Sequence, residues 1–288
     1  MSLNMIVTVK QVPDTHNVNE DAMKPDGTVN RSALPAIFNP EDLNALEEAL
    51  KIKDLHGGHV TVITMGPPKA IEVLKDCLYR GADDVILLSD RQFAGADTLA
   101  TSYALKCAIE KIGTYDLILC GRQAIDGDTA QVGPQIAEKL KIDQLTCVSE
   151  IFDINTESIT VKRSLDGGSE IVKSRLPVLL TVTSEANDPR PPSAKKVMTY
   201  KNIECLRDES YDETYIQDSA PEVLSHIKEW NVASVNANPK YCGIEGSPTR
   251  VKKIENVVLT AADTKQIADT EEDIGHLVHE LIKEHILG

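Results

Sequence analysis

The first half of the chain alternates between short apolar runs and longer segments with apolar residues at helical spacing. The apolar runs are nearly continuous and rich in β-branched residues, which is typical of strands buried on both faces of a parallel sheet. They are Met5–Val9, Val60–Thr64, Val85–Leu88, Leu117–Cys120 and a fifth candidate at Leu145–Val148. These runs predict the strands of a central sheet.

Helical patterns separate the runs. Asn39 and Pro40 predict a helix start, because Asn is a good N-cap and Pro suits the first helical position. Leu43, Leu46 and Leu50 then form one apolar stripe. Similar patterns predict helices after Pro68, over 97–111 and over 132–140. Strands that alternate with amphipathic helices predict an α/β fold with a doubly wound parallel sheet.

The pattern changes after residue 150. Two β-type segments flank Asp166-Gly167-Gly168 and predict a β-hairpin over 158–175. Pro177–Thr183 predicts one more buried strand, so we place the α/β domain at residues 1–184. From 185 to 288 the pattern weakens until a helix near Glu271–His285. This region is predicted to be a docking loop and a C-terminal arm that lies against a partner chain.

Composition and charge argue against several classes of function. The net charge of −15 argues against nucleic acid, whose phosphates the chain would repel. No apolar run approaches the ~20 residues of a membrane span, and no secretion signal is evident at the N-terminus. The six cysteines form no C-x-x-C pair, which favours free thiols in a reducing cytoplasm. We therefore expect a cytoplasmic protein.

The stretch CGRQAIDGDTAQVGP at 120–134 carries the candidate chemistry, because it follows a predicted strand and precedes a predicted helix. Ligands of open α/β sheets bind beyond the carboxyl ends of the strands, near helix N-termini. Glycines let the backbone approach a phosphate, and Arg122 offers a charged partner. A plain loop, with Asp126 and Asp128 in Asx-turns or as an N-cap, explains the same residue types equally well. Residue types alone leave both interpretations open.

Catalytic and metal motifs are weak. Asp126 and Asp128 have no histidine, lysine or third carboxylate beside them in the sequence, and the G-x-S-x-G pattern is missing. His276 and His279 lie in an H-x-x-H-E order that differs from the zinc motif H-E-x-x-H. We predict no side-chain catalyst and no metal ligand.

Three stretches resemble the β subunit of electron transfer flavoproteins: VKQVPDT at 9–15, NPEDLNALEEALKIK at 39–53 and the 120–134 stretch. SLDGGSEIVKSRLPVLLTV at 164–182 and GSPTRV at 246–251 also fit, so the likeness covers nearly the whole chain. The resemblance implies a Rossmann-like fold of the adenine nucleotide alpha hydrolase type. It also implies a heterodimer with an FAD-carrying α subunit, across which the C-terminal arm reaches.

The resemblance further implies an adenine-nucleotide site formed by the strand-end loops, with no catalytic side chain. The implied cofactor-binding residues lie on the first strand, at two helix starts, after the second strand and in the long loop. They are Thr8, Asn39, Asp42, Met65, Gly66, Thr98, Thr101, Gly121, Arg122, Gln123, Ala124, Ile125, Asp126, Gly127, Asp128, Thr129, Ala130, Gln131 and Val132.

Two branches of the family remain open, together with a lone adenine-nucleotide hydrolase or ATP binder on the same fold. DGDTAQVGP and GADTLATSY resemble the bifurcating branch. There a second FAD oxidises NADH and sends electrons to an acyl-CoA dehydrogenase and to ferredoxin or flavodoxin. In the alternative, mitochondrial branch, AMP fills the site structurally, and the loop has a carboxylate at the position of Gly127. The leucine anchor of the family's docking loop is replaced here by Ala194.

Overall fold

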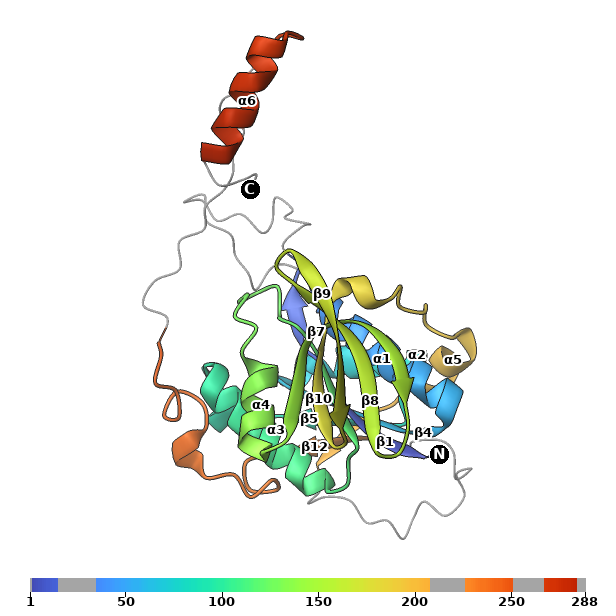
Figure 1. Cartoon of the computed structure of the whole chain (residues 1–288). Helices are drawn as coiled ribbons and strands as arrows, with labels where there is room; N and C mark the ends of the chain where they lie inside the picture. Colours follow the sequence, from blue (N-terminus) through green and yellow to red (C-terminus); the bar gives the residue numbers. More distant parts are fainter. Residues whose placement is uncertain (1, 15–34, 208–225, 251–266, 284–288) are drawn as a thin grey trace.

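The computed structural model describes residues 2–14, 35–207, 226–250 and 267–283. A central sheet of ten strands dominates the molecule, in the order β11-β12-β5-β4-β1-β6-β10-β7-β8-β9 (Figure 1). The strands before the hairpin are β1 (Leu3–Thr8), β4 (Gly58–Met65), β5 (Asp84–Leu88), β6 (Leu117–Gly121) and β7 (Asp143–Ile154). The later strands are β8 (Ser158–Leu165), β9 (Gly168–Arg175), β10 (Val178–Val182), β11 (Cys205–Arg207) and β12 (Ile227–Trp230).

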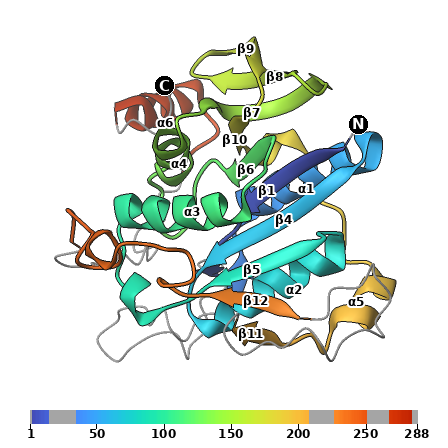
Figure 2. The same cartoon turned by 90° about the horizontal axis from the view of Figure 1, so that it is seen from below.

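The helices cover both faces of this sheet (Figure 2). They are α1 (Pro40–His56), α2 (Ile71–Arg80), α3 (Thr98–Ile112), α4 (Val132–Leu140) and α5 (Ala194–Tyr200), whereas α6 (Glu271–Lys283) buries none of its residues. Apolar residues of α1 and α2 belong to one buried cluster, and those of α3 and α4 to a second. The doubly wound α/β fold predicted from the alternating pattern is therefore confirmed.

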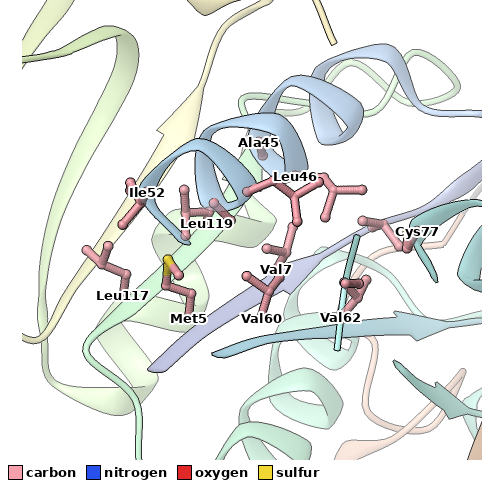
Figure 3. Close-up of a cluster of buried hydrophobic side chains, with 14 of the residues drawn as sticks. Met5, Val7, Ala45, Leu46, Ile52, Val60, Val62, Cys77, Leu117 and Leu119 are labelled. Atoms are coloured by element: carbon pink, nitrogen blue, oxygen red, sulfur yellow. The ribbon is translucent and has the colours of Figure 1, made fainter. Parts of the chain in front are cut away.

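Side-chain alternation along each strand explains the two clusters. Successive residues of a strand point to opposite faces. Met5 and Val7 accordingly belong to the cluster under α1, while Ile6 between them belongs to the cluster under α3. Leu117 and Leu119 follow the same rule on β6. Figure 3 shows Leu46 of α1 lying over Val7 and Leu119. Because both faces are covered there, the central strands β5, β6 and β10 are apolar at nearly every position.

The parallel part of the sheet runs from β11 to β7, and β8 and β9 add an antiparallel edge. Leu165 pairs with Gly168 across a two-residue turn, in which Gly167 has a φ of +82°. This is the hairpin predicted at Asp166-Gly167-Gly168. The fifth candidate strand, Leu145–Val148, lies in the first half of the longer β7.

The region after residue 184 differs from the predicted arm. β12 pairs in parallel with β5, and β11 pairs with β12, so both extend the main sheet. Trp230, Val232, Val235 and Cys242 are buried against the α3 side. The segment 227–247 is thus part of the domain body. For the part after residue 247 the arm stays a prediction, and α6 (Glu271–Lys283), which is described there, buries none of its residues.

β2 (Gln11–Pro13) and β3 (Ala36–Phe38) form a two-stranded antiparallel sheet beside the start of α1. None of the helices in the described ranges is long and apolar enough to cross a membrane. All six cysteines are free thiols.

Candidate functional site

A cavity with a volume of about 990 Å³ opens at the carboxyl ends of β1, β4, β5 and β6. The loops after these four strands form its walls, together with the first residues of α3 and α4. This is the edge at which open α/β sheets bind ligands, because the parallel strands all end there and the helix N-termini face it. The volume is at the upper end of the range for small-molecule sites.

The first turn of α1 holds the beginning of the loop after β6. Asp42 accepts hydrogen bonds from the backbone N–H groups of Gly121 (3.0 Å) and Lys10 (2.9 Å). Glu41 accepts from the N–H of Gln123 (2.9 Å) and from Nε of Arg122 (3.1 Å). Both carboxylates are almost fully buried. They therefore fix the loops after β1 and β6 relative to each other.

Asn39 completes this connection. Its amide donates to the carbonyl of Gln123 (2.9 Å) and its Oδ1 accepts from the N–H of Ile125 (3.1 Å). The side chain makes no capping hydrogen bond to α1, although Asn39 is the N-cap residue by position. It is fully buried and does not line the cavity. The predicted helix start is confirmed, but the side chain shapes the loop and does not cap the helix.

Burial changes the chemistry of Asp42. Desolvation raises the pKa of its carboxyl group to about 7, although hydrogen bonds from Asn39, Gly121 and Lys10 and the charge of Lys10 lower it. A buried carboxylate is costly when its charge is only partly compensated. The group thus titrates near neutral pH while it bridges two loops of the cavity wall.

The later half of the same loop is held more loosely. Asp126 pairs with Lys10 at 2.6 Å, and the Lys10 side chain is 48% exposed. Asp128 accepts a hydrogen bond from the side-chain amide of Gln123 (3.0 Å). Asp128 and Ala130 have φ values of +50° and +51°, a backbone conformation that is unusual for residues other than glycine. Asp126 and Asp128 therefore shape the loop through Lys10 and Gln123, and neither is the N-cap of α4, which is Gln131.

The start of α3 forms the opposite wall. Oδ1 of Asp97 accepts from the N–H groups of Leu99 and Ala100, so Asp97 caps the N-terminus of α3. The other carboxylate oxygen accepts from Thr249, through its N–H (3.1 Å) and its hydroxyl (2.8 Å). The hydroxyl of Thr98 donates to Oε1 of Gln131 (2.9 Å) and joins the starts of α3 and α4.

The structure brings the predicted site residues together. Asn39 and Ile125 lie behind the wall, and the other residues implied by the resemblance line the cavity. Those that line it are Thr8, Asp42, Met65, Gly66, Thr98, Thr101, Gly121, Arg122, Gln123, Ala124, Asp126, Gly127, Asp128, Thr129, Ala130, Gln131 and Val132.

Several cavity residues were missed. Ser89, Asp90 and Arg91 follow β5 and line the same space. The apolar run Val85–Leu88 predicts a strand, so the rule that ligands bind beyond the carboxyl ends of strands points to these three residues, which the resemblance does not include. Thr249 had no such signal, since it reaches the cavity from the C-terminal region. In the described part of the chain, no group of histidine, cysteine, aspartate or glutamate residues is suited to a metal ion.

A doubly wound α/β domain with a cavity at the carboxyl edge of its sheet belongs to a class of folds that bind their ligands at this edge. Comparison with known proteins identifies the family. Residues 26–204 match the model of the electron transfer flavoprotein domain. The chain belongs to the electron transfer flavoprotein family. Within this family it resembles the β subunits and the FixA proteins.

Three relatives illustrate the match. The electron transfer flavoprotein subunit beta of Clostridium acetobutylicum is 40% identical over 99% of this chain and 100% of its own length. The caffeyl-CoA reductase-Etf complex subunit CarD of Acetobacterium woodii is 41% identical over 99% and 100%. Protein FixA of Sinorhizobium fredii is 40% identical over 97% and 92%. The chain is therefore an electron transfer flavoprotein subunit.

Proposed function

We propose that the chain is the β subunit of a heterodimeric, bifurcating electron transfer flavoprotein that binds FAD in the 990 Å³ cavity. In this proposal the subunit oxidises NADH and passes electrons to the FAD of the α subunit. From there they go to an acyl-CoA dehydrogenase and to ferredoxin or flavodoxin. The size of the cavity is the observation that carries the proposal, because it is at the top of the range for small-molecule sites.

The residues present fit a flavin nucleotide. Bound FAD would supply hydride and electron chemistry, and the protein would supply position and electrostatics. The loop 121–131 would hold the phosphates, since Gly127 leaves open space beside the backbone and α4 starts at Val132. The hydroxyls of Thr98 and Thr101 lie on the opposite wall and would orient the rest of the cofactor. No side-chain acid or nucleophile is needed for this role.

The hydrogen bonds behind the cavity wall also support binding of a nucleotide in the cavity. The buried side chains Asn39, Glu41 and Asp42 fix the loop from behind, so that its backbone faces the cavity in one conformation. A binding site held from behind loses less conformational entropy when the ligand binds. In our proposal these three residues position the loop, and the residues of Gly121–Val132 other than Ile125 contact the ligand.

Partner choice rests on the relatives and on the C-terminal region. One relative is a subunit of a complex with a caffeyl-CoA reductase, which favours an acyl-CoA dehydrogenase as one electron acceptor. α6 carries Ile274, Val278 and Ile282 at helical spacing, and all three are more than 40% exposed. We propose that this helix lies on the α subunit. Ala194, at the start of α5, gives no large anchor for docking to a mitochondrial-type dehydrogenase.

The test is to purify the complex of the chain with its α subunit and to count the cofactors. Two FAD per heterodimer support the proposal. One FAD together with one AMP would overturn the bifurcating assignment in favour of the alternative, in which AMP is a structural ligand. A complex without any nucleotide in the β subunit would overturn both.

A further inference from the structure

The cavity that we propose for FAD is rich in acidic groups, which is unfavourable for an anionic ligand. Its lining includes three cationic side chains, Lys10, Arg91 and Arg122, and six acidic ones. The acidic residues are Asp42, Asp90, Asp97, Asp126, Asp128 and Glu229. A phosphate that enters this space needs a cation that is not already neutralised.

Two of the three cations are engaged with carboxylates. Lys10 contacts both oxygens of Asp126, at 2.6 and 2.7 Å. Nε of Arg122 donates to Glu41. Within the described residues, Arg91 makes no side-chain hydrogen bond or ion pair. Of the three cationic side chains, Arg91 is thus the one whose guanidinium group has no hydrogen-bond or ion-pair partner among the described residues.

The backbone that carries Arg91 is fixed even though its side chain is free. Asp90 accepts from the N–H of Gln92 (3.0 Å) and from the N–H of Val232 (3.1 Å). Phe93 is buried in the core on the α3 side. Asp90 is therefore committed to backbone groups and leaves its neighbour Arg91 unpaired. A rigid turn with a free cation at the rim of a cavity is suited to bind an anion.

Arg91 approaches the cavity from the side opposite to the Gly121–Gln131 loop. It follows β5, and β4 and β1 separate β5 from β6 in the sheet. Three interstrand spacings amount to about 14 Å. A ligand with two phosphates can meet the backbone of the loop from one side and the long side chain of Arg91 from the other.

We propose that Arg91 binds the diphosphate of the nucleotide and determines the preference of the cavity for diphosphate ligands. This inference rests on the proposed function, because it takes an adenine dinucleotide as the ligand. The role of Arg91 differs from that of the loop 121–131. Arg91 would donate a charge-assisted hydrogen bond to a phosphate, whereas the loop offers backbone N–H groups. Nothing in the comparisons assigns a role to this residue.

The test compares Arg91→Gln and Arg91→Lys with Arg175→Gln in the full chain freed of nucleotide. Arg175 is exposed on β9 and makes a control that loses the same charge away from the cavity. We expect Arg91→Gln to weaken binding of ADP and of FAD roughly 10- to 100-fold. Arg91→Lys should retain part of the affinity, and Arg175→Gln should match the wild type. Binding of adenosine should not change.

Two results would overturn the assignment. One is an ADP affinity of Arg91→Gln equal to that of Arg175→Gln. The other is an equal loss for adenosine and ADP, which indicates a distorted cavity. If Arg91→Gln binds ADP normally but associates more weakly with the α subunit, the residue belongs to the subunit interface and the inference also fails. A wild-type chain that binds neither ADP nor FAD contradicts the proposed function itself, so the two failures are distinguishable.

Discussion

The two halves of the loop after β6 have opposite surroundings. Gly121, Arg122 and Gln123 are held by buried carboxylates of α1, and the space beside Gly121 is filled by Asp42 and Glu41. Gly127 has nothing within 4 Å of the position where a Cβ would stand, and Asp126 is held by an exposed lysine. The first half is closely packed against buried side chains, whereas the second half leaves open space in which a ligand could bind. Within residues 121–131, substitutions in the first half should therefore change mainly the stability, and substitutions in the second half should change mainly ligand binding.

The largest effect is expected at Gly121. A Cβ there would lie 2.5 Å from Oδ1 and 2.6 Å from the backbone nitrogen of Asp42. The backbone must shift to accommodate it, and overpacking of this kind costs about 1–3 kcal/mol or more. Gly121→Ala should lower the free energy of unfolding by that amount in urea denaturation. The matched control is Gly127→Ala, which should leave stability nearly unchanged, and equal effects of both would contradict the comparison.

The next effect is on binding. Gly127→Asp adds a negative charge to the open half of the loop and should weaken FAD binding to the chain roughly ten-fold, because like charges repel in a partly desolvated site. Stability should not fall, since the position has free space. Gly127→Asn is the control of similar size without the charge. Flavin content that is the same in the Asp and Asn variants would remove the reason to call this loop the phosphate site, whereas FAD in the α subunit should remain in both.

The pH dependence of the unfolding free energy tests Asp42, which holds the first, closely packed half of the loop after β6. The folded-state pKa of Asp42 is raised from 3.8 to about 7 by desolvation. The folded chain therefore binds this proton more tightly than the unfolded chain, and the contribution of Asp42 to stability decreases as pH rises from about 4 to 7. Asp42→Asn keeps an acceptor oxygen but does not titrate, so unfolding measured between pH 4 and 7 should show a weaker decrease. An identical pH profile in wild type and variant would show that Asp42 does not titrate in this range.

Several of these features could be predicted from the sequence. The alternation of apolar runs and amphipathic segments is a local pattern, so it defined the parallel sheet and the helix 132–140, which matches α4 (Val132–Leu140). The helix predicted over 97–111 is α3 (Thr98–Ile112), because its apolar residues recur at helical spacing within one short segment. The site residues Thr8, Met65 and Gly127 came from the family resemblance, and the strand-end rule explains why they meet in one cavity.

Other features could not be predicted, because they depend on contacts between distant segments. β12 is only four residues long, and its place beside β5 depends on pairing between residues 228–230 and 86–88. Asn39 was expected to cap α1, but its side chain is drawn to Gln123 and Ile125, more than eighty positions away. The same residue type would serve either purpose. Only the position of the β6 loop decides between them.

The smallest effect is expected for the pair of Lys10 and Asp126, which joins the open half of the loop to the end of β1. The side chains are 48% and 23% exposed, so the ion pair should contribute about 0–1 kcal/mol to stability. Lys10→Gln and Asp126→Asn should each change the unfolding free energy by less than Gly121→Ala does. The double variant should show whether the two residues are coupled. A coupling energy of several kcal/mol would mean that the open half is held as firmly as the buried half, and the contrast between the two halves would fail.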